Sequence, residues 1–252
     1  MDISEFNRLS DQKNYQRHPW ETSRKNVLKY FLNQTNIKFP IDRIVDIGSG
    51  DAFVIHSLLE NNFATEYFAI DTAYNEEIIN QLKANNKNSQ VQYLSSLDEY
   101  YANHDTQKNT LFLCMDVLEH TEDEKIILDF LQNETGNYFF FAVPAFQKLF
   151  SNHDILLGHY RRYSLPELEN LLNKNNFKIL DKGYYFFTLL ALRWLEKSRK
   201  KDQKESIDNW EGGKFKTDLI NFVLKTDFKI IMLLKKLNIR INGLSCYCLC
   251  TK

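Results

Sequence analysis

Residues 44–51 read Ile-Val-Asp-Ile-Gly-Ser-Gly-Asp (IVDIGSGD), and this stretch decides the fold. The apolar, β-branched run before Gly48 is typical of a buried strand, and the two glycines indicate a tight turn. Residues 51–59 continue with apolar side chains at helical spacing. A buried strand, a glycine turn and a helix in this order predict the first unit of a parallel sheet.

Further apolar segments are predicted as strands of the same sheet, at residues 67–70, 91–94, 110–115 and 137–143. Helical segments separate them, near residues 75–83, 97–102 and 121–133. Because strands that are apolar on both faces alternate with helices, we expect a doubly wound, parallel α/β sheet covered on both sides. Two later strands are expected, at residues 177–187 with a kink at Gly183, and at residues 244–250.

The composition of the 252-residue chain is that of a folded protein, since 43% of its residues are hydrophobic. Its 32 basic and 33 acidic residues leave a net charge of -1, so the overall charge does not indicate a nucleic-acid partner. The first twenty residues lack the apolar core of a signal peptide, and no segment approaches the ~18–20 apolar residues that cross a bilayer. We therefore expect a cytoplasmic protein.

The cysteines favour the same location. Cys246, Cys248 and Cys250 alternate along the last predicted strand, which places three thiols on one face, and Cys114 lies in an earlier strand. One strand cannot bend three thiols around a single ion, so we favour a buried strand and predict no metal site. Free thiols are typical of a reducing cytoplasm.

Polar residues follow the predicted strands at the sheet edge where open α/β sheets bind ligands. This edge carries residues 46–51, Asp71, residues 95–98 and Asp116. Gly48 and Gly50 would let the backbone approach a ligand closely. Asp71 lies at the end of the next strand, 23 residues after Gly48, where its carboxylate can accept hydrogen bonds from both ribose hydroxyls.

A nicotinamide dinucleotide is the rival ligand for this loop. Its G-x-G-x-x-G fingerprint provides a tight turn and a closely packed helix start for pyrophosphate. Residues 48–53 read G-S-G-D-A-F instead, so Phe53 replaces the third glycine and Asp51 adds negative charge where phosphate would lie. The acidic loop favours a cationic sulfonium ligand with an amino group, and a nicotinamide-dependent oxidoreductase is the weaker alternative.

IVDIGSGD followed by FAID resembles the first two motifs of the class I S-adenosylmethionine-dependent methyltransferases, and CMDVLEH resembles their fourth-strand motif, as in the ubiquinone-biosynthesis type. The segments RHPWETSR, DTAY, VPAF and SNHDILLGHYRRYS resemble an uncharacterised bacterial branch of that superfamily. The matching segments extend from about residue 17 to residue 190. The resemblance implies a Rossmann-like αβα sandwich with a mostly parallel seven-stranded sheet, an antiparallel last strand and S-adenosylmethionine as cofactor.

The resemblance also implies roles for individual residues. The cofactor-binding residues would be Trp20, Arg24, Asp46, Gly48, Ser49, Gly50, Asp71, Thr72, Ser96, Leu97, Asp116 and Val117. Among these, the loop at Gly48 to Gly50 would hold the methionine portion, Ser96 to Asp98 would border the adenine, and Asp116 to Leu118 would face the methyl group. A helix at residues 18–24 would close over the cofactor, with Arg24 near its carboxylate. Many family members have glycine at Ala52, where we expect tighter packing without loss of binding.

Three histidines are candidate bases for proton removal from an acceptor hydroxyl. His120 ends DVLEH, whereas His153 and His159 lie in the loop after the fifth strand and are favoured over it. Asp154 follows His153, although neighbouring side chains need not touch. Two other histidines, His56 and His104, are not candidates and are expected to be solvated.

The arginine pair in the same loop could bind a carboxylate or a phosphate. Arg161 and Arg162 are consecutive, so at most one is expected to face the pocket. Arg161 is included among the candidate catalytic residues. The alternative is that one arginine pairs with a glutamate of the following helix, which a capping box at Ser164 predicts to extend through Leu172.

The whole chain, residues 1–252, is interpreted as one methyltransferase domain with N-terminal lid helices (1–40), a cofactor-binding core (41–187), a helical insertion (188–243) and a final strand (244–252). Its acceptor is expected to be a small or lipid-linked metabolite methylated at oxygen or carbon, and not a nucleic acid. A catalytically inactive S-adenosylmethionine-binding module is the main alternative. The basic helix near residues 218–237 could contact a membrane surface or a protein, or pack on the sheet. The sequence does not indicate an oligomeric state.

Overall fold

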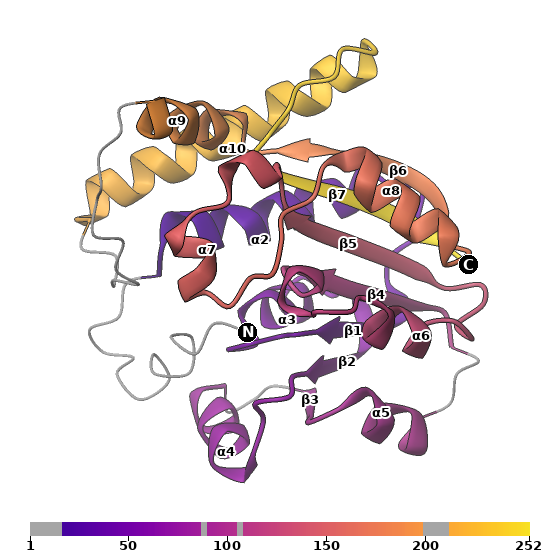
Figure 1. Cartoon of the computed structure of the whole chain (residues 1–252). Coiled ribbons are helices and arrows are strands. Elements are labelled where there is room, and N and C mark those ends of the chain that lie inside the picture. The colour runs from indigo at the N-terminus through magenta and orange to yellow at the C-terminus, as the bar shows by residue number, and fades with distance from the viewer. Residues whose placement is uncertain (1–16, 87–89, 105–107, 199–211) are drawn as a thin grey trace.

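The computed structural model describes residues 17–86, 90–104, 108–198 and 212–252. Its centre is a seven-stranded sheet in the order β3-β2-β1-β4-β5-β7-β6 (Figure 1). The strands are β1 (Ile41–Ile47), β2 (Ala64–Ile70), β3 (Val91–Leu94), β4 (Thr110–Met115), β5 (Tyr138–Pro144), β6 (Lys178–Tyr185) and β7 (Ser245–Thr251). Strands β1 to β5 pair in parallel, and β7 runs antiparallel to both β5 and β6. The predicted α/β sheet with an antiparallel last strand is confirmed.

The helices alternate with the strands as the periodicity predicts. They are α2 (Pro19–Leu32), α3 (Phe53–Leu59), α4 (Glu76–Asn85), α5 (Leu97–Asn103), α6 (Lys125–Phe130), α7 (Asn152–Leu156), α8 (Leu165–Lys174), α9 (Phe187–Ser198) and α10 (Lys214–Lys236), with 3-10 turns η1 (Leu118–His120) and η2 (Gln147–Leu149). Helix α8 begins at the predicted capping box, in which Ser164 and Glu167 each bond the other's backbone amide. Part of the polar segment between α9 and α10, and the first part of the expected lid, lie outside the described residues.

Two local expectations were wrong. The helix expected at residues 121–133 is shorter, since α6 covers only Lys125–Phe130 and the flanking residues form turns and bends. The irregularity of β6 lies between Ile179 and Asp181, where the register with β7 shifts, and not at Gly183. Gly183 has a packing role instead: a Cβ there would lie 3.1 Å from the hydroxyl oxygen of Tyr247 on the neighbouring strand.

Two apolar cores cover the two faces of the sheet. Helices α2, α3, α4 and α10 contribute to one core, and α5, α6 and α8 contribute to the other. Strand β7 serves both, since Tyr247 and Leu249 join the first core while Cys246, Cys248 and Cys250 join the second. All three thiols are buried and free, so the predicted strand with thiols on one face is confirmed.

The helical insertion supplies α10, which packs along α2 on one face of the sheet (Figure 1). Phe228 of α10 lies edge-on to Tyr30 of α2, with 5.8 Å between the ring centroids. This contact fixes the position of α2, whose other end reaches the carboxyl ends of the strands. In the described part of the chain, none of the helices combines the length and apolarity needed to cross a membrane.

Candidate active site at the carboxyl ends of the strands

The glycine loop after β1 is bonded to the end of β2. The amides of Gly48 and Ser49 donate to the carbonyl oxygen of Ile70 at 2.8 and 3.1 Å. Gly48 has a φ of +70°, in the left-handed region that favours glycine, and a Cβ at this position would lie 2.5 Å from Cγ2 of Val117. Glycine is therefore required for the loops after β1 and β4 to meet, which brings two of the predicted cofactor-binding segments together.

Asp71 is 2% exposed at the end of β2, and its carboxylate is held by two backbone amides. Oδ2 accepts a hydrogen bond from Gly50 and Oδ1 accepts one from Ala73, both at 2.9 Å. Burial raises the pKa of Asp71, and the bonds from Ala73 and Gly50 oppose this effect. Tyr74 adds a bond from its hydroxyl to the Gly50 carbonyl at 2.8 Å, whereas Thr72 is exposed. Asp71, the residue predicted to bind the ribose, therefore also holds the glycine loop in place.

Asp46 lies at the base of the glycine loop, where its buried carboxylate accepts a hydrogen bond from Oγ of Ser49 at 2.9 Å. Burial raises the pKa of Asp46 to about 7, against the opposing effects of Ser49 and the positive charge of Arg24. A carboxyl group with a pKa near neutrality is typical of functional sites, and a cation bound beside it would favour its charged form.

Ala52 follows the glycine loop and adopts a left-handed backbone conformation. Its φ is +60°, and its side chain is fully buried. The methyl group is accommodated within the core, as expected from the sequence, at the cost of a left-handed backbone that glycine adopts without strain. Its effect on ligand binding stays a prediction.

Helix α2 and the residues just before it bring two arginines to the strand ends. Arg24 pairs with Asp116, directly after β4, and Arg17 pairs with Asp51 of the glycine loop. The guanidinium carbon of Arg24 lies 4.7 Å from the ring centroid of Trp20. This placement agrees with the predicted lid. Arg17 also pairs with Glu21, so it offsets the Asp51 charge only in part, and that charge is a somewhat weaker argument against pyrophosphate than the sequence indicated.

Ser96 and Leu97 begin helix α5. Oγ of Ser96 accepts a hydrogen bond from the amide of Glu99 at 3.1 Å, which makes Ser96 the N-cap of the helix. Leu97 is 6% exposed and belongs to an apolar core. The two residues have clear structural roles, and their contact with an adenine ring stays a prediction.

Buried polar atoms without hydrogen-bond partners gather between the lid and the sheet. Among the described residues, Nε of Arg24, both carboxylate oxygens of Glu119 and the hydroxyl of Tyr185 have no partner. Burial raises the pKa of Glu119 to about 8 and that of Tyr185 to about 12, while the charge of Arg24 lowers both. The three side chains are therefore electrostatically coupled. Because buried polar groups are almost always paired, this cluster indicates a place for a polar ligand.

The loop after β5 is organised by Asp154, which is fully buried in α7. Its Oδ1 lies 3.0 Å from Nδ1 of His159, and Arg162 donates to the same carboxylate from Nε at 2.7 Å and Nη2 at 3.1 Å. Although burial raises the pKa of Asp154, the bonds from His159 and Arg162 hold it well below its usual range. The histidine that Asp154 joins is His159 and not the adjacent residue His153.

His159 in turn lies against His120, from the turn after β4. Their ring centroids are 4.6 Å apart and the rings are nearly perpendicular, at 83°. Glu119 is next to them, and the potential ligand atoms of these three residues all lie within 4.8 Å of one another. The amide of Tyr160 donates to the Glu119 carbonyl at 2.7 Å, which holds the two loops together. The fold thus brings together two of the three predicted base candidates.

Both arginines of the loop have acidic partners. Arg161 bonds Oε1 of Glu124 at 2.5 Å, and Arg162 bonds Asp154. The sequence allowed pairing with a glutamate of the following helix, but Glu124 lies far earlier in the chain, at the start of α6. A role for Arg161 in binding the acceptor stays a prediction.

His56 and His104, which were expected to be solvated, are half-buried and contact aromatic side chains. Nε2 of His56 lies 2.8 Å from the hydroxyl of Tyr93, and burial lowers the pKa of His56. The ring of His104 stacks on Tyr100 and lies edge-on to Phe68, with 4.4 Å between the latter centroids. These histidines stabilise the core on either side of β2.

Sequence reasoning missed Glu119 and Tyr185. A signal for Glu119 was present in Asp116–His120 (DVLEH), where an acidic residue lies just after a predicted strand and next to a histidine. Tyr185 offered no such signal, because an aromatic residue in an apolar strand is normally part of the core. Only its burial and its electrostatic interaction with Arg24 and Glu119 distinguish it.

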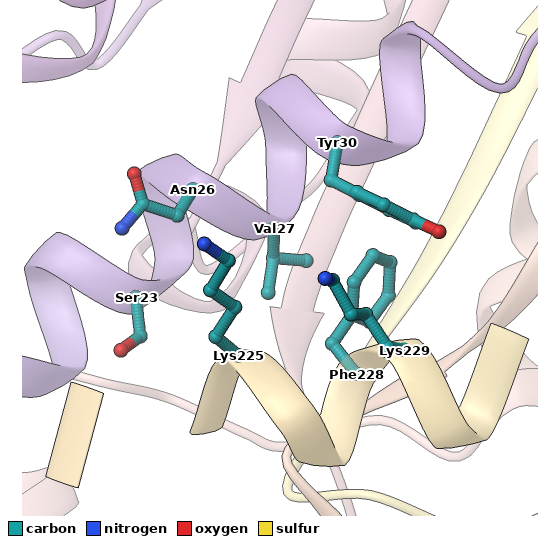
Figure 2. Close-up of a pocket in the computed structure, with 7 residues that line it drawn as sticks. All are labelled: Ser23, Asn26, Val27, Tyr30, Lys225, Phe228 and Lys229. Atoms are coloured by element: carbon teal, nitrogen blue, oxygen red, sulfur yellow. The ribbon is translucent and has the colours of Figure 1, made fainter. Parts of the chain in front are cut away.

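A hollow on the surface lies elsewhere. Figure 2 shows that it follows the seam between α2 and α10, with Val27 and Phe228 at its base and Lys225 and Lys229 beside it. None of its lining residues belongs to the loops at the strand ends. The hollow is therefore distinct from the cluster of unpartnered atoms.

No protein-family model matches the chain, and neither does any curated protein. Solved structures match it in fold. An S-adenosylmethionine-dependent methyltransferase from Archaeoglobus fulgidus is 15% identical with a TM-score of 0.53, and the match covers 90% of this chain and 92% of that one. The Haloferax volcanii complex between the Trm112 methyltransferase activator and a protein assigned as a methyltransferase gives 11% identity and a TM-score of 0.58, over 100% and 98% of the chains.

The [4+2]-cyclase SpnF gives 12% identity and a TM-score of 0.57, over 95% of this chain and 84% of that one. At such identities the likeness shows the fold alone. That fold is the Rossmann-like architecture of class I S-adenosylmethionine-dependent methyltransferases, as the sequence motifs implied.

Proposed function

We propose that this protein is an S-adenosylmethionine-dependent methyltransferase that acts on a small or lipid-linked acceptor, at an oxygen or a carbon atom. The observation that carries the proposal is the group of buried, unpartnered polar atoms of Arg24, Glu119 and Tyr185, under a lid helix and beside an acidic glycine loop. Such a site can enclose a ligand that carries both a carboxylate and a positive charge. The proposed methyltransferase domain comprises the whole chain.

The residues at the strand ends fit this cofactor. Asp71, fixed by two amides, would accept hydrogen bonds from the ribose hydroxyls through its remaining lone pairs. Nε of Arg24 is buried without a partner among the described residues and would donate to the carboxylate of the methionine portion. Gly48 to Gly50 would hold that portion, Ser96 and Leu97 would border the adenine, and Asp116 and Val117 would face the methyl group.

The bound cofactor would supply a methyl group on a positively charged sulfur atom. The chain's own contribution is alignment, exclusion of water and, for a hydroxyl acceptor, removal of a proton. Helix α2 and the residue Arg17 just before it cover the strand ends through the Arg24–Asp116 and Arg17–Asp51 pairs, so this segment can exclude water.

His159 is the base that the geometry favours. An ionised Asp154 can only accept, so Nδ1 of His159 carries the hydrogen in their 3.0 Å bond. This leaves Nε2 of His159 with a lone pair that can take a proton from the acceptor. His120 lies against His159 and is the second candidate, whereas His153 lies on α7 outside this pair.

Two alternatives come from other classes of function. A binding module would bind S-adenosylmethionine without turnover. SpnF has a similar fold and is named a [4+2]-cyclase, so the fold alone does not determine the activity. A nicotinamide oxidoreductase would bind NAD. Titration calorimetry with S-adenosylmethionine, S-adenosylhomocysteine and NAD separates these functions, because the proposal requires binding of the first two ligands only. Exclusive binding of NAD would refute the proposal.

Turnover is tested with S-adenosylmethionine that carries a labelled methyl group, together with fractionated host extract. Transfer of label to an extractable small molecule or lipid supports the proposal. Cofactor binding with no transfer to any fraction would support the inactive module instead. A His159→Ala variant is expected to keep its cofactor affinity and to lose at least about 100-fold in transfer rate, the usual contribution of a general base.

A lipid-linked acceptor is favoured by the surface of α10. On the side away from α2, this helix exposes a stripe of large apolar side chains, Phe215, Leu219, Phe222, Ile230, Leu233 and Leu237, with Phe215 83% exposed. Six lysines and two aspartates give residues 214–236 a positive charge. An apolar stripe flanked by lysines suits the surface of an anionic membrane, so we propose that α10 rests there and that the protein is cytoplasmic and membrane-peripheral.

Sedimentation with lipid vesicles tests this surface. The protein should sediment with phosphatidylglycerol-containing vesicles and not with pure phosphatidylcholine, and a Phe222→Ser, Leu233→Ser variant should remain in the supernatant. Ile126→Ser is the matched control, because Ile126 is 59% exposed on α6, away from α10. Equal sedimentation of all three proteins would exclude α10 as the membrane contact.

A further inference from the structure

Glu119, His120 and His159 form a compact group of potential metal ligands. Their potential ligand atoms, one carboxylate oxygen and two imidazole nitrogens, all lie within 4.8 Å of one another. Glu119 and His120 belong to the turn after β4, and His159 belongs to the loop after β5. The tertiary structure therefore assembles the group from two segments about forty residues apart, at the edge of the sheet where ligands bind.

The carboxylate of Glu119 is the observation that calls for a ligand. Glu119 is fully buried, and neither of its oxygens has a hydrogen-bond partner among the described residues. A protonated carboxyl group would remove the charge but would still leave a buried donor and acceptor unpaired, which is unfavourable. Arg24, the arginine whose charge affects Glu119 most, is already paired with Asp116. A bound cation would satisfy the carboxylate directly.

The surroundings of His159 are those of a metal-binding histidine. Asp154 accepts the hydrogen of Nδ1 at 3.0 Å, which fixes the ring and leaves the lone pair on Nε2. Metal-ligating histidines almost always donate their other ring hydrogen to such a carboxylate or carbonyl. Asp154 is itself held in place by Arg162, so the orientation of His159 does not depend on a ligand.

We infer that Glu119, His120 and His159 form a binding site for a divalent transition-metal ion, with one coordination position left for water or for an oxygen atom of the acceptor. Two imidazole nitrogens and one carboxylate oxygen suit Zn²⁺, and also Mn²⁺, Fe²⁺ or Co²⁺, whereas Mg²⁺ prefers oxygen ligands. Three protein ligands with an open position are typical of catalytic rather than structural zinc sites. Binding of the ion does not depend on the proposed function, and only its use in orienting an acceptor oxygen rests on that function. Because Nε2 of His159 cannot both ligate the ion and accept a proton, His159 is a ligand in the metal-bound protein and the proposed base only in the metal-free protein.

The test measures metal binding to the full chain without affinity tag and without S-adenosylmethionine. Protein treated with EDTA and dialysed is titrated with Zn²⁺ in competition with a chromophoric chelator. We expect one equivalent to bind, and we expect Glu119→Gln and His159→Gln each to weaken the binding at least about 100-fold, since even residues that only support a ligand contribute 10–100-fold. Mg²⁺ in large excess should not displace the ion.

His56→Gln is the matched control, because His56 lies outside the group and glutamine can keep a bond to Tyr93. Circular dichroism of each variant verifies that it is folded. Co²⁺ in place of Zn²⁺ gives a second readout, because its visible absorption depends on the geometry of its ligands. The wild-type protein should show the strong visible bands of non-octahedral Co²⁺, and these bands should change in Glu119→Gln. This spectrum reports on the ligands even if one variant binds too weakly to titrate.

Absence of stoichiometric Zn²⁺ binding to the wild-type chain would overturn the inference. So would unchanged affinity and an unchanged Co²⁺ spectrum in both Glu119→Gln and His159→Gln, because the ion would then lie elsewhere. Calorimetry with S-adenosylmethionine on the same metal-free protein reports separately on the proposed function. If S-adenosylmethionine binds but Zn²⁺ does not, the metal site is refuted and the proposed function stands. If Zn²⁺ binds but S-adenosylmethionine does not, the proposed function fails and the metal site stands.

Discussion

Arg24, in helix α2, pairs with Asp116, which follows β4 and lies 92 residues later in the chain. Asp116 has a φ of +55°, an uncommon value for a residue other than glycine, so its carboxylate is held in a strained backbone. Strain of this kind persists where the surrounding structure over-determines it, and it is concentrated at functional sites. The pair joins the lid to the loop that would face the transferred methyl group.

Replacement of Arg24 tests whether it binds the cofactor carboxylate. Arg24→Ala is expected to weaken S-adenosylmethionine binding by about 10-fold or more, since a hydrogen bond to a charged group contributes about 1.5–3 kcal/mol. Decarboxylated S-adenosylmethionine should bind equally to wild type and variant, as measured by calorimetry. Arg17→Ala, on the same lid but paired with Asp51, should affect both ligands alike. An equal loss for both ligands in Arg24→Ala would contradict the assignment.

Asp71 is expected to be indispensable for the ribose. Asp71→Ala removes the group that would accept from the ribose hydroxyls and also frees the amides of Gly50 and Ala73, so binding of S-adenosylhomocysteine should become undetectable or at least about 100-fold weaker. Asp71→Asn keeps an acceptor for one amide and should be intermediate. Unchanged affinity in Asp71→Ala, measured by calorimetry on folded protein, would remove Asp71 from the ribose site.

Gly48 is expected to tolerate no side chain. In Gly48→Ala the new methyl group would lie 2.5 Å from Cγ2 of Val117, and the φ of +70° would add strain, so the free energy of unfolding should fall by about 2 kcal/mol or more. Adding Val117→Ala removes the overlap but not the strain, and should recover part of the loss. Urea denaturation measures both. If Gly48→Ala lowered the free energy of unfolding by the same amount with and without Val117→Ala, the two loops would not be in contact at these residues.

The raised pKa of Asp46 predicts how the stability of the ligand-free protein depends on pH. Its pKa is about 7 in the folded state and about 3.9 when unfolded, so between these values the folded state binds a proton that the unfolded state does not. The free energy of unfolding contributed by Asp46 should therefore decrease as pH rises from about 4 to about 7, and level off above.

The measurement is the urea concentration at the midpoint of unfolding, determined at several pH values for wild-type protein and for Asp46→Asn. Asp71 also has a raised pKa and acts in the same direction, so the substitution should reduce the slope rather than abolish it. A saturating cationic ligand should oppose the effect, because it favours the ionised carboxylate. A slope that is the same in wild type and in Asp46→Asn would show that Asp46 is not the titrating group.

The fold could be predicted because its signals are local. The apolar run before Gly48, the capping box at Ser164 and the alternation of Cys246, Cys248 and Cys250 each depend on neighbours within one element, and all three occur as predicted. Local signals were weaker where tertiary packing decides the outcome. The bulge of β6 lies at residues 179–181 because the register with β7 shifts there, which no pattern within β6 could show.

The sequence by itself determined the sheet, the glycine loop and the set of acidic residues at the strand ends, since hydrophobic periodicity and turn chemistry act over a few residues. Only the tertiary structure decided that Asp154 orients His159, that Arg24 reaches Asp116, and that Glu119 is buried without a partner. These facts depend on which loops the strand order brings together and on what covers them. Burial and pairing between distant segments are properties of the packed chain, and they create the chemistry of the site.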